Sequence, residues 1–157
     1  MPLSEEDRGV IARAFEDSMP TIEEVFHIYC GKVGAPERFS IEIFDASGSG
    51  EENAAGEPAA RAIAVHTIKT TDWGERNFTD TARRKARATL RTGRDSGDLV
   101  RNAKELFQDG DAPNPGACLA DVGGKRICVA TSGLRGTEDE PFALLVIELM
   151  KRLAPAS

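Results

Sequence analysis

Apolar residues recur at helical spacing in the N-terminal part of the chain. The first stripe, within residues 5–18, consists of Val10, Ile11, Ala14 and Phe15. Pro20 interrupts this pattern, and a proline inside a helix removes one backbone N–H. A second stripe then consists of Ile22, Val25, Phe26 and Tyr29. The spacing therefore predicts two N-terminal helices within residues 1–31.

Two short apolar runs follow and have the pattern of strands. Residues 39–45 alternate apolar and other positions from Phe39, and residues 62–68 form the second run. Residues 47–58 between them are rich in Gly, Ala, Ser and Glu, which indicates an exposed loop. Two strands joined by one loop favour an antiparallel pair.

A second pair of strands is predicted at residues 117–122 and 125–132. They flank Gly123-Gly124, a dipeptide typical of a two-residue hairpin turn. In this register Val122 faces Lys125, and Cys118 faces Val129. Side chains alternate between the two faces of a sheet, so Cys118 and Cys128 point apart and form no disulfide with each other.

Three more helices complete the order of elements. A basic helix at residues 81–92 has a narrow stripe of Ala82, Ala86 and Leu90, and a further helix is expected at 96–107. The clearest amphipathic pattern begins near Thr137 and consists of Phe142, Leu145, Val146, Leu149 and Leu153. Helices that cover a central antiparallel sheet define the α+β class.

Length and composition fit one globular domain over residues 1–157, with a core from 39 to 153. Apolar residues make up 40% of the chain and charged residues 29%, far from the composition of disordered proteins. No apolar run approaches the roughly 18 residues of a membrane span. The N-terminus is acidic, unlike a signal peptide. We therefore expect a soluble, cytoplasmic protein with no membrane partner.

Charge is distributed unevenly along the chain. Residues 76–104 contain nine basic and three acidic side chains, a local charge of +6, which leaves −12 on the rest because the net charge is −6. The acidic remainder and the low aromatic content of 6% argue against nucleic-acid binding. The basic segment is interpreted either as a solvated helix face or as an anion site for phosphate, carboxylate or haem propionate.

Two local features are candidate ligand contacts. His66 lies near the end of a predicted strand, where it is either a hydrogen-bonded sheet histidine or a metal or haem-iron ligand. Residues 132–137 form a strand-to-helix turn, whose free N–H groups suit an anion. The alternative is that the helix caps itself, because negative charge is already present at its start in Glu138, Asp139 and Glu140. No phosphate loop, dinucleotide fingerprint or HExxH motif is present, so the sequence leaves open whether the protein is an enzyme and assigns no catalytic residue.

Two segments together resemble the haem-degrading-domain family, which includes GlcG-like and HbpS-like proteins. The first is Val65-His66 followed by Arg84-Lys85-Ala-Arg-Ala-Thr-Leu90, similar to a family pattern in which a strand-end histidine precedes a helix with an Arg-Lys pair. The second is Val129-Ala-Thr-Ser132-Gly133-Leu134 followed by an acidic helix start. The similarity is greatest to a short, uncharacterised branch that shares the Ser-Gly-Leu sequence.

This resemblance implies a three-layer α-β-α, profilin-like fold, self-association into a homo-oligomer, and haem or small-ligand binding. The first hypothesis is accordingly a small-ligand-binding domain with haem or another tetrapyrrole as its candidate cofactor. The expected ligand contacts are His66, also as the ligand of haem iron, and Arg84, Lys85, Arg87, Ser132 and Gly133. One alternative is a non-catalytic oligomeric assembly or adaptor protein. Another is an enzyme subunit that acts on a small anionic metabolite.

Overall fold

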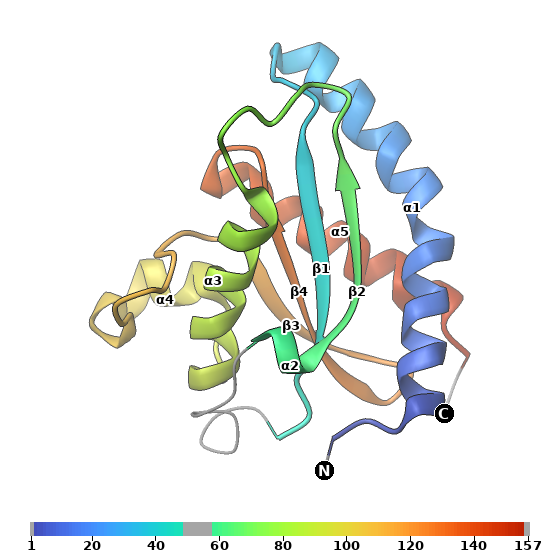
Figure 1. The fold of residues 1–157 in the computed structure, drawn as a ribbon. Coiled ribbons are helices and arrows are strands. Elements are labelled where there is room, and N and C mark those ends of the chain that lie inside the picture. Colours follow the sequence, from blue (N-terminus) through green and yellow to red (C-terminus); the bar gives the residue numbers. More distant parts are fainter. Residues whose placement is uncertain (1, 49–57, 156–157) are drawn as a thin grey trace.

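A computed structural model describes residues 2–48 and 58–155 and shows a central sheet (Figure 1). The strands are β1 (Phe39–Asp45), β2 (Ala62–Ile68), β3 (Ala117–Val122) and β4 (Lys125–Ser132). They lie in the order β2-β1-β4-β3, and each neighbouring pair is antiparallel. Both predicted strand pairs are confirmed. The predicted 47–58 loop falls largely on residues 49–57, outside the described residues.

The hairpin between β3 and β4 has the predicted register. Val122 pairs with Lys125 and Cys118 with Val129. Gly123 and Gly124 have φ angles of 56° and 78°, a left-handed conformation that glycine adopts without steric cost. Cys118 and Cys128 belong to apolar clusters on opposite faces of the sheet, and all three cysteines are free thiols.

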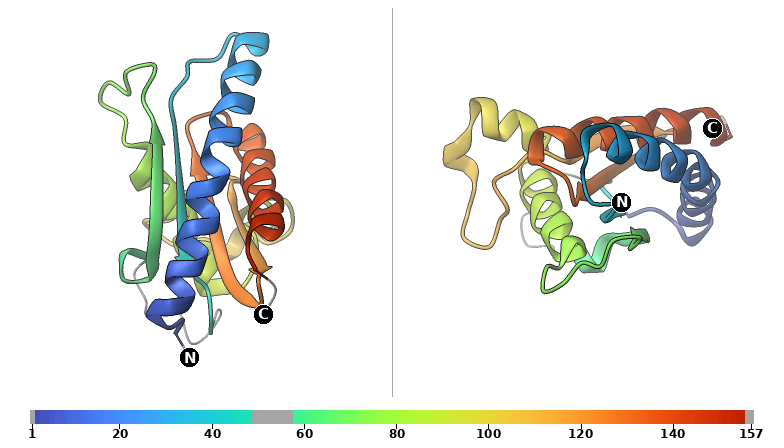
Figure 2. Two further views of the ribbon diagram at one scale, coloured as in Figure 1. Left: turned by 90° about the vertical axis from the view of Figure 1, so that its right-hand side faces the viewer. Right: turned by 90° about the horizontal axis from the view of Figure 1, so that it is seen from above.

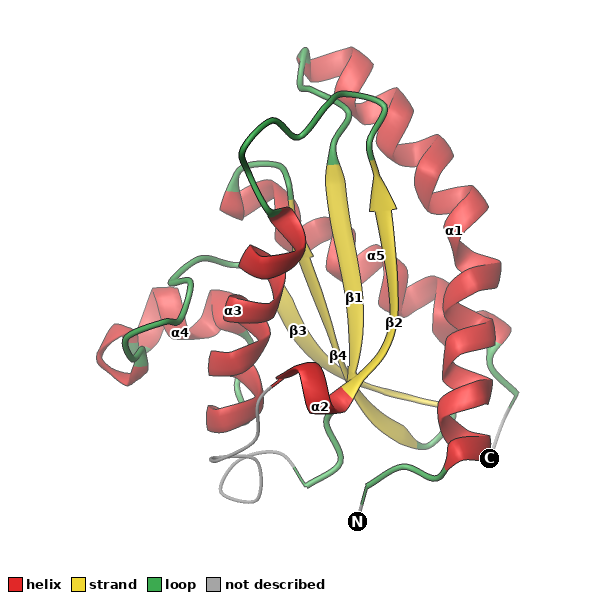
Figure 3. Cartoon of the chain, viewed as in Figure 1, coloured by secondary structure: helices red, strands yellow, loops and turns green. Residues whose placement is uncertain are grey.

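Helices cover both faces of the sheet. The helices α1 (Glu5–Val33) and α5 (Gly136–Leu153) pack on one face, and α3 (Phe78–Thr92) packs on the other (Figure 2). The short helix α2 (Pro58–Arg61) precedes β2, and α4 (Ser96–Asn102) with a 3-10 turn (Lys104–Leu106) follows α3 (Figure 3). The expected three-layer α-β-α arrangement of the α+β class is confirmed. Within residues 2–48 and 58–155, no helix is long and apolar enough to cross a membrane.

The prediction of two N-terminal helices is wrong, because α1 runs without a break through Pro20. Proline removes one intrahelical hydrogen bond, but the residues on both sides of it are held by packing. Phe15, Met19, Ile22 and Phe26 are all buried in the same core. Burial of these large side chains offsets the lost hydrogen bond, so tertiary packing overrides the local signal.

The ends of three other helices also differ from prediction. The basic helix expected at 81–92 begins at Phe78, because the Asn77 side chain caps it by accepting from the N–H of Asp80. The helix expected at 96–107 ends at Asn102, because Ala103 takes φ −155° and ψ 49°, outside the helical region. Leu106, which lies beyond the end of this helix, is exposed. The last helix begins at Gly136, one residue before the predicted Thr137, and Arg135 is its N-cap.

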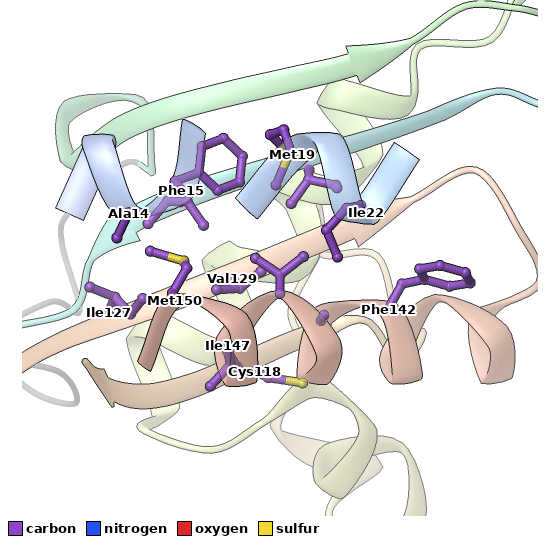
Figure 4. Packing of buried hydrophobic residues seen from close by; sticks show 14 of the residues in the cluster. Ala14, Phe15, Met19, Ile22, Cys118, Ile127, Val129, Phe142, Ile147 and Met150 are labelled. Carbon is purple, nitrogen blue, oxygen red and sulfur yellow. The ribbon is translucent and has the colours of Figure 1, made fainter. Parts of the chain in front are cut away.

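The core on the α1 and α5 face is the larger of the two. Phe15, Met19 and Ile22 of α1 share this core with Phe142, Ile147 and Met150 of α5 and with Val129 of β4 (Figure 4). The core on the α3 face is built from small residues, including Ala82, Ala86, Ala117 and Ala130. Small side chains let the backbone of α3 approach the sheet closely, so polar groups of α3 reach the end of β4.

Candidate functional site

The sheet separates the predicted ligand contacts into two groups. His66 pairs with Ile41, whose side chain lies in the α1 and α5 core, and His66 Nε2 is 2.7 Å from Glu23 Oε1 of α1. Arg84, Lys85 and Arg87 are on α3, on the opposite face. The expected grouping of His66 with these basic residues on one ligand is therefore not formed in this chain. The loop from β2 crosses the end of the sheet, so α3 returns along the other face (Figure 1).

The surroundings of His66 form a shallow hollow of about 290 Å³. Its apolar lining is Phe15, Met19, Pro20, Ala64 and Val65, and Glu16 and Glu23 of α1 line it as well. The His66 side chain is 27% exposed. The imidazole is thus an accessible, hydrogen-bonded sheet histidine beside an apolar wall.

Most arginines of the basic segment bind groups of the protein itself. Arg83 Nε lies 2.7 Å from Glu42 Oε1, and Arg91 contacts the buried Asp111 carboxylate at 2.6 Å. Arg87 Nε is 3.7 Å from the same carboxylate, and Arg84 Nε donates to the carbonyl of Gly110 at 2.9 Å. These contacts join α3 to the loop before β3 and to β1. Arg84 and Arg87 are therefore engaged structurally, and the basic helix is largely neutralised from within.

Lys85 differs from these arginines because it is buried. Its Nζ lies 2.8 Å from Asp139 Oδ2 and 2.8 Å from the Thr131 carbonyl oxygen, and both side chains of the ion pair are only 2% exposed. Asp139 Oδ1 also accepts from the N–H of Leu134 at 2.9 Å. Burial raises the pKa of Asp139 to about 6, and the nearby Lys85 ammonium acts in the opposite direction.

The turn from Ser132 to Thr137 caps itself. The N–H of Leu134 donates to Asp139, and the N–H of Arg135 donates to Glu138 Oε2 at 3.2 Å. Side-chain carboxylates thus occupy the backbone donors that an anion would use. Of the two interpretations of this turn, self-capping is the one seen.

Lys85 and Ser132, predicted separately as ligand contacts, line one hollow of about 340 Å³, here called the Lys85 hollow. Its wall comes from α3, β4, α5 and the loop before β3. The remaining lining residues are Arg76, Asn77, Phe78, Thr81, Asn114, Leu134, Gly136 and Asp139. The Ser132 hydroxyl and the Asn114 side-chain amide have no hydrogen-bond partner among residues 2–48 and 58–155.

A second hollow of about 440 Å³ adjoins the first, because Arg76 and Leu134 line both. We call it the arginine hollow, since Arg38, Arg76 and Arg135 line it. Gly133, another predicted contact, belongs to this hollow. The loops that form it meet at the upper end of the molecule in Figure 1. The sequence does not identify Arg38, which is an isolated residue without a motif. Arg135 lies in the predicted 132–137 turn, but that prediction concerned the backbone N–H groups and not this side chain.

The described parts of the chain contain no group of three or more His, Cys, Asp or Glu side chains placed to hold a metal ion. A single histidine such as His66 is enough for haem iron, so the haem hypothesis depends on that residue alone. The two hollows supply hydrogen-bond donors and positive charge instead.

The fold of this α+β domain is similar to that of several solved structures. A double mutant of HbpS from Streptomyces reticuli has a TM-score of 0.56 at 15% identity, covering 95% of this chain and 87% of that one. Protein ORFY from Klebsiella pneumoniae has a TM-score of 0.57 at 10% identity, covering 87% and 88%. A complex of PduOC with haem has a TM-score of 0.54 at 14% identity, covering 95% of both chains.

No protein-family model matches the chain, and no curated protein matches it significantly. At these identities the likeness concerns the fold. The resemblance to the haem-degrading-domain proteins is confirmed at that level.

Proposed function

We propose that this protein binds a small polar organic molecule in the Lys85 hollow. The observation that supports this most directly is the pair of uncommitted groups on its wall, the Ser132 hydroxyl and the Asn114 amide. Ligand sites combine a concave surface with a few convergent polar groups, and volumes start at about 300 Å³. The 340 Å³ of this hollow suits a molecule much smaller than a tetrapyrrole.

The ion pair of Lys85 and Asp139 gives the hollow a rigid wall. Both charges are desolvated and hold each other at 2.8 Å, while Thr131 and Leu134 satisfy further hydrogen bonds. Because these side chains are already held in place, little conformational entropy is lost when a ligand binds against them, which favours affinity. The pair is formally neutral, so it adds no net charge to the hollow.

Replacement of Asn114 tests this function, since Asn114 is exposed and its change leaves the core intact. Asn114→Leu removes the amide from the lining of the hollow and puts an apolar group in its place. We expect at least one member of a panel of hydroxy acids, amino acids and nucleosides to raise the melting temperature saturably. Its dissociation constant should increase roughly tenfold or more in the variant, the effect of losing a hydrogen bond of about 1.5 kcal/mol.

Asn102→Leu on α4 is the matched control, because it makes the same chemical change outside the hollow. It should leave ligand binding unchanged. Absence of any saturable ligand, or equal loss in both variants, would show that the Lys85 hollow is not the site.

Haem bound at His66 is the second candidate. It is supported by the shared fold of the PduOC–haem complex and by the apolar wall beside the imidazole. Iron must displace Glu23, because His66 Nε2 now lies 2.7 Å from that carboxylate. The basic residues of α3 lie on the opposite face of the sheet, so within one chain they do not pair with the propionates of a haem bound at His66.

His27 provides a matched control for the haem candidate. It lies 2.6 Å from Glu37 in an equivalent His–Glu pair but is 72% exposed, away from the His66 hollow. We expect His66→Ala to shift the Soret band and weaken haem binding at least tenfold, and His27→Ala to change neither. A Soret spectrum that is identical in both variants, or no saturable haem titration, would eliminate His66 as the iron ligand.

A further inference from the structure

We propose that the arginine hollow is a binding site for an oxyanion, the phosphate or carboxylate groups of a small molecule. This goes beyond the proposed function, because it holds whether or not the Lys85 hollow is occupied. The site is a cavity of about 440 Å³ that three guanidinium groups line from separate parts of the chain. Arg38 precedes β1, Arg76 lies between β2 and α3, and Arg135 lies between β4 and α5.

These three arginines differ from most others in their partners. Arg83, Arg91, Arg94 and Arg101 each form an ion pair with a carboxylate of the protein. For Arg38, Arg76 and Arg135, the described part of the chain supplies no carboxylate within ion-pair distance. A cluster of like charges repels itself, so its convergence on one cavity favours an anion that neutralises it.

Arg38 adds a second, independent observation. Its Nε atom is buried and has no hydrogen-bond partner in the residues that the structure describes. The guanidinium carbon lies 5.3 Å from the ring centroid of Phe78, which holds the group by a cation–π contact. Buried donors are normally paired, and the arginine fork matches the two oxygens of a carboxylate or phosphate. Arg38 also lines the hollow, where an oxyanion meets a guanidinium to which the described residues offer no carboxylate.

Two negative features face the arginines and are too weak to neutralise them. Glu138 is the one carboxylate among the lining residues, and Tyr29 Oη and the Arg135 N–H already donate to it, at 2.6 and 3.2 Å. The C-terminal end of α1 at Val33 and Gly34 contributes about half a negative charge. Three positive side chains against these two features leave the hollow positive by more than one charge.

Inorganic phosphate and citrate are the probes for this site, titrated by isothermal calorimetry at low ionic strength and again at physiological salt. We expect saturable binding of at least one probe, weakened tenfold or more by Arg76→Gln and by Arg135→Gln. Both residues are exposed, so the variants should keep the wild-type melting temperature. Binding of phosphate alone assigns a phosphorylated ligand, and binding of citrate alone assigns a carboxylate; either supports the site.

Arg13→Gln is the matched control, since Arg13 is exposed on α1, distant in sequence from the hollow, and the change alters net charge equally. It should leave probe binding intact. No saturable binding of either probe, or equal weakening by Arg13→Gln and Arg76→Gln, would overturn the proposal. If a ligand lost by Asn114→Leu binds normally to both arginine variants, and neither probe binds, the oxyanion site fails while the Lys85 hollow stands.

Discussion

Replacing Lys85 with methionine is expected to lower the free energy of unfolding by about 3–5 kcal/mol at pH 7, the usual cost of breaking a buried ion pair. The methionine keeps the volume of the aliphatic stem but removes the ammonium group. Asp139 is then left with the Leu134 N–H as its donor, in a position only 1% exposed. Urea unfolding followed by circular dichroism measures the change.

The loss should depend on pH with a definite sign. Burial already raises the pKa of Asp139 to about 6 against the opposing effect of Lys85, so removing Lys85 raises that pKa further. A carboxyl with a folded pKa above its unfolded value of about 3.9 binds more protons when folded. The stability of Lys85→Met should therefore recover as the pH falls from 7 to 5.

Lys125→Met is the control for this prediction. Lys125 pairs with Asp7 at 3.7 Å on the surface, where an ion pair contributes about 1 kcal/mol or less. A loss in Lys85→Met as small as this, or one that is the same at pH 5 and pH 7, would contradict the account of the buried pair.

Replacing Gly133 with alanine should cost about 3 kcal/mol or more, through strain and collision together. Gly133 has a φ of 141°, and a Cβ built there lies 2.8 Å from Phe39 Cα and closer still to the Arg38 carbonyl oxygen. Both neighbours are backbone atoms, at the start of β1 and in the residue before it, so they cannot move away as a flexible side chain can. Thermal and urea unfolding should both show the loss.

Gly9→Ala should have the opposite effect. Gly9 lies within α1 with no atom within 4 Å of a built Cβ, so alanine there should stabilise by about 0.5–1 kcal/mol. If Gly133→Ala were as stable as the wild type, the close backbone approach would not be a constraint. The presence of glycine at position 133 would then be explained by its predicted ligand contact and not by the fold.

Local chemistry explains which elements were predictable. Gly123-Gly124 sets the hairpin, and alternation sets the strands, because both signals act between near neighbours. Pro20 gave a wrong prediction because its penalty is also a local signal. The long-range packing of Phe15 and Ile22 against the core keeps the helix continuous. The face on which α3 packs depends on the path of a loop, which no periodicity encodes.

The candidate site was likewise predictable only in its individual residues and not in how they are grouped. Lys85 and Ser132 were identified separately and meet in one hollow, whereas His66 lies on the far face of the sheet. The charge count of residues 76–104 treated each arginine alone. Glu42 and Asp111, which neutralise Arg83 and Arg91, come from outside that segment and become visible only after folding.

The arginine hollow is assembled from residues near positions 38, 76 and 135, so the unfolded chain has nothing equivalent to offer a ligand. Any molecule that binds there binds the native state alone, and its binding energy adds to the stability of the whole domain. At a hundred times its dissociation constant, such a molecule stabilises by about 2.7 kcal/mol. In a chain of this size that corresponds to a rise in melting temperature of roughly 5–10 °C. The natural ligand can therefore be recognised by thermal shift from metabolite mixtures, without a spectroscopic or enzymatic signal.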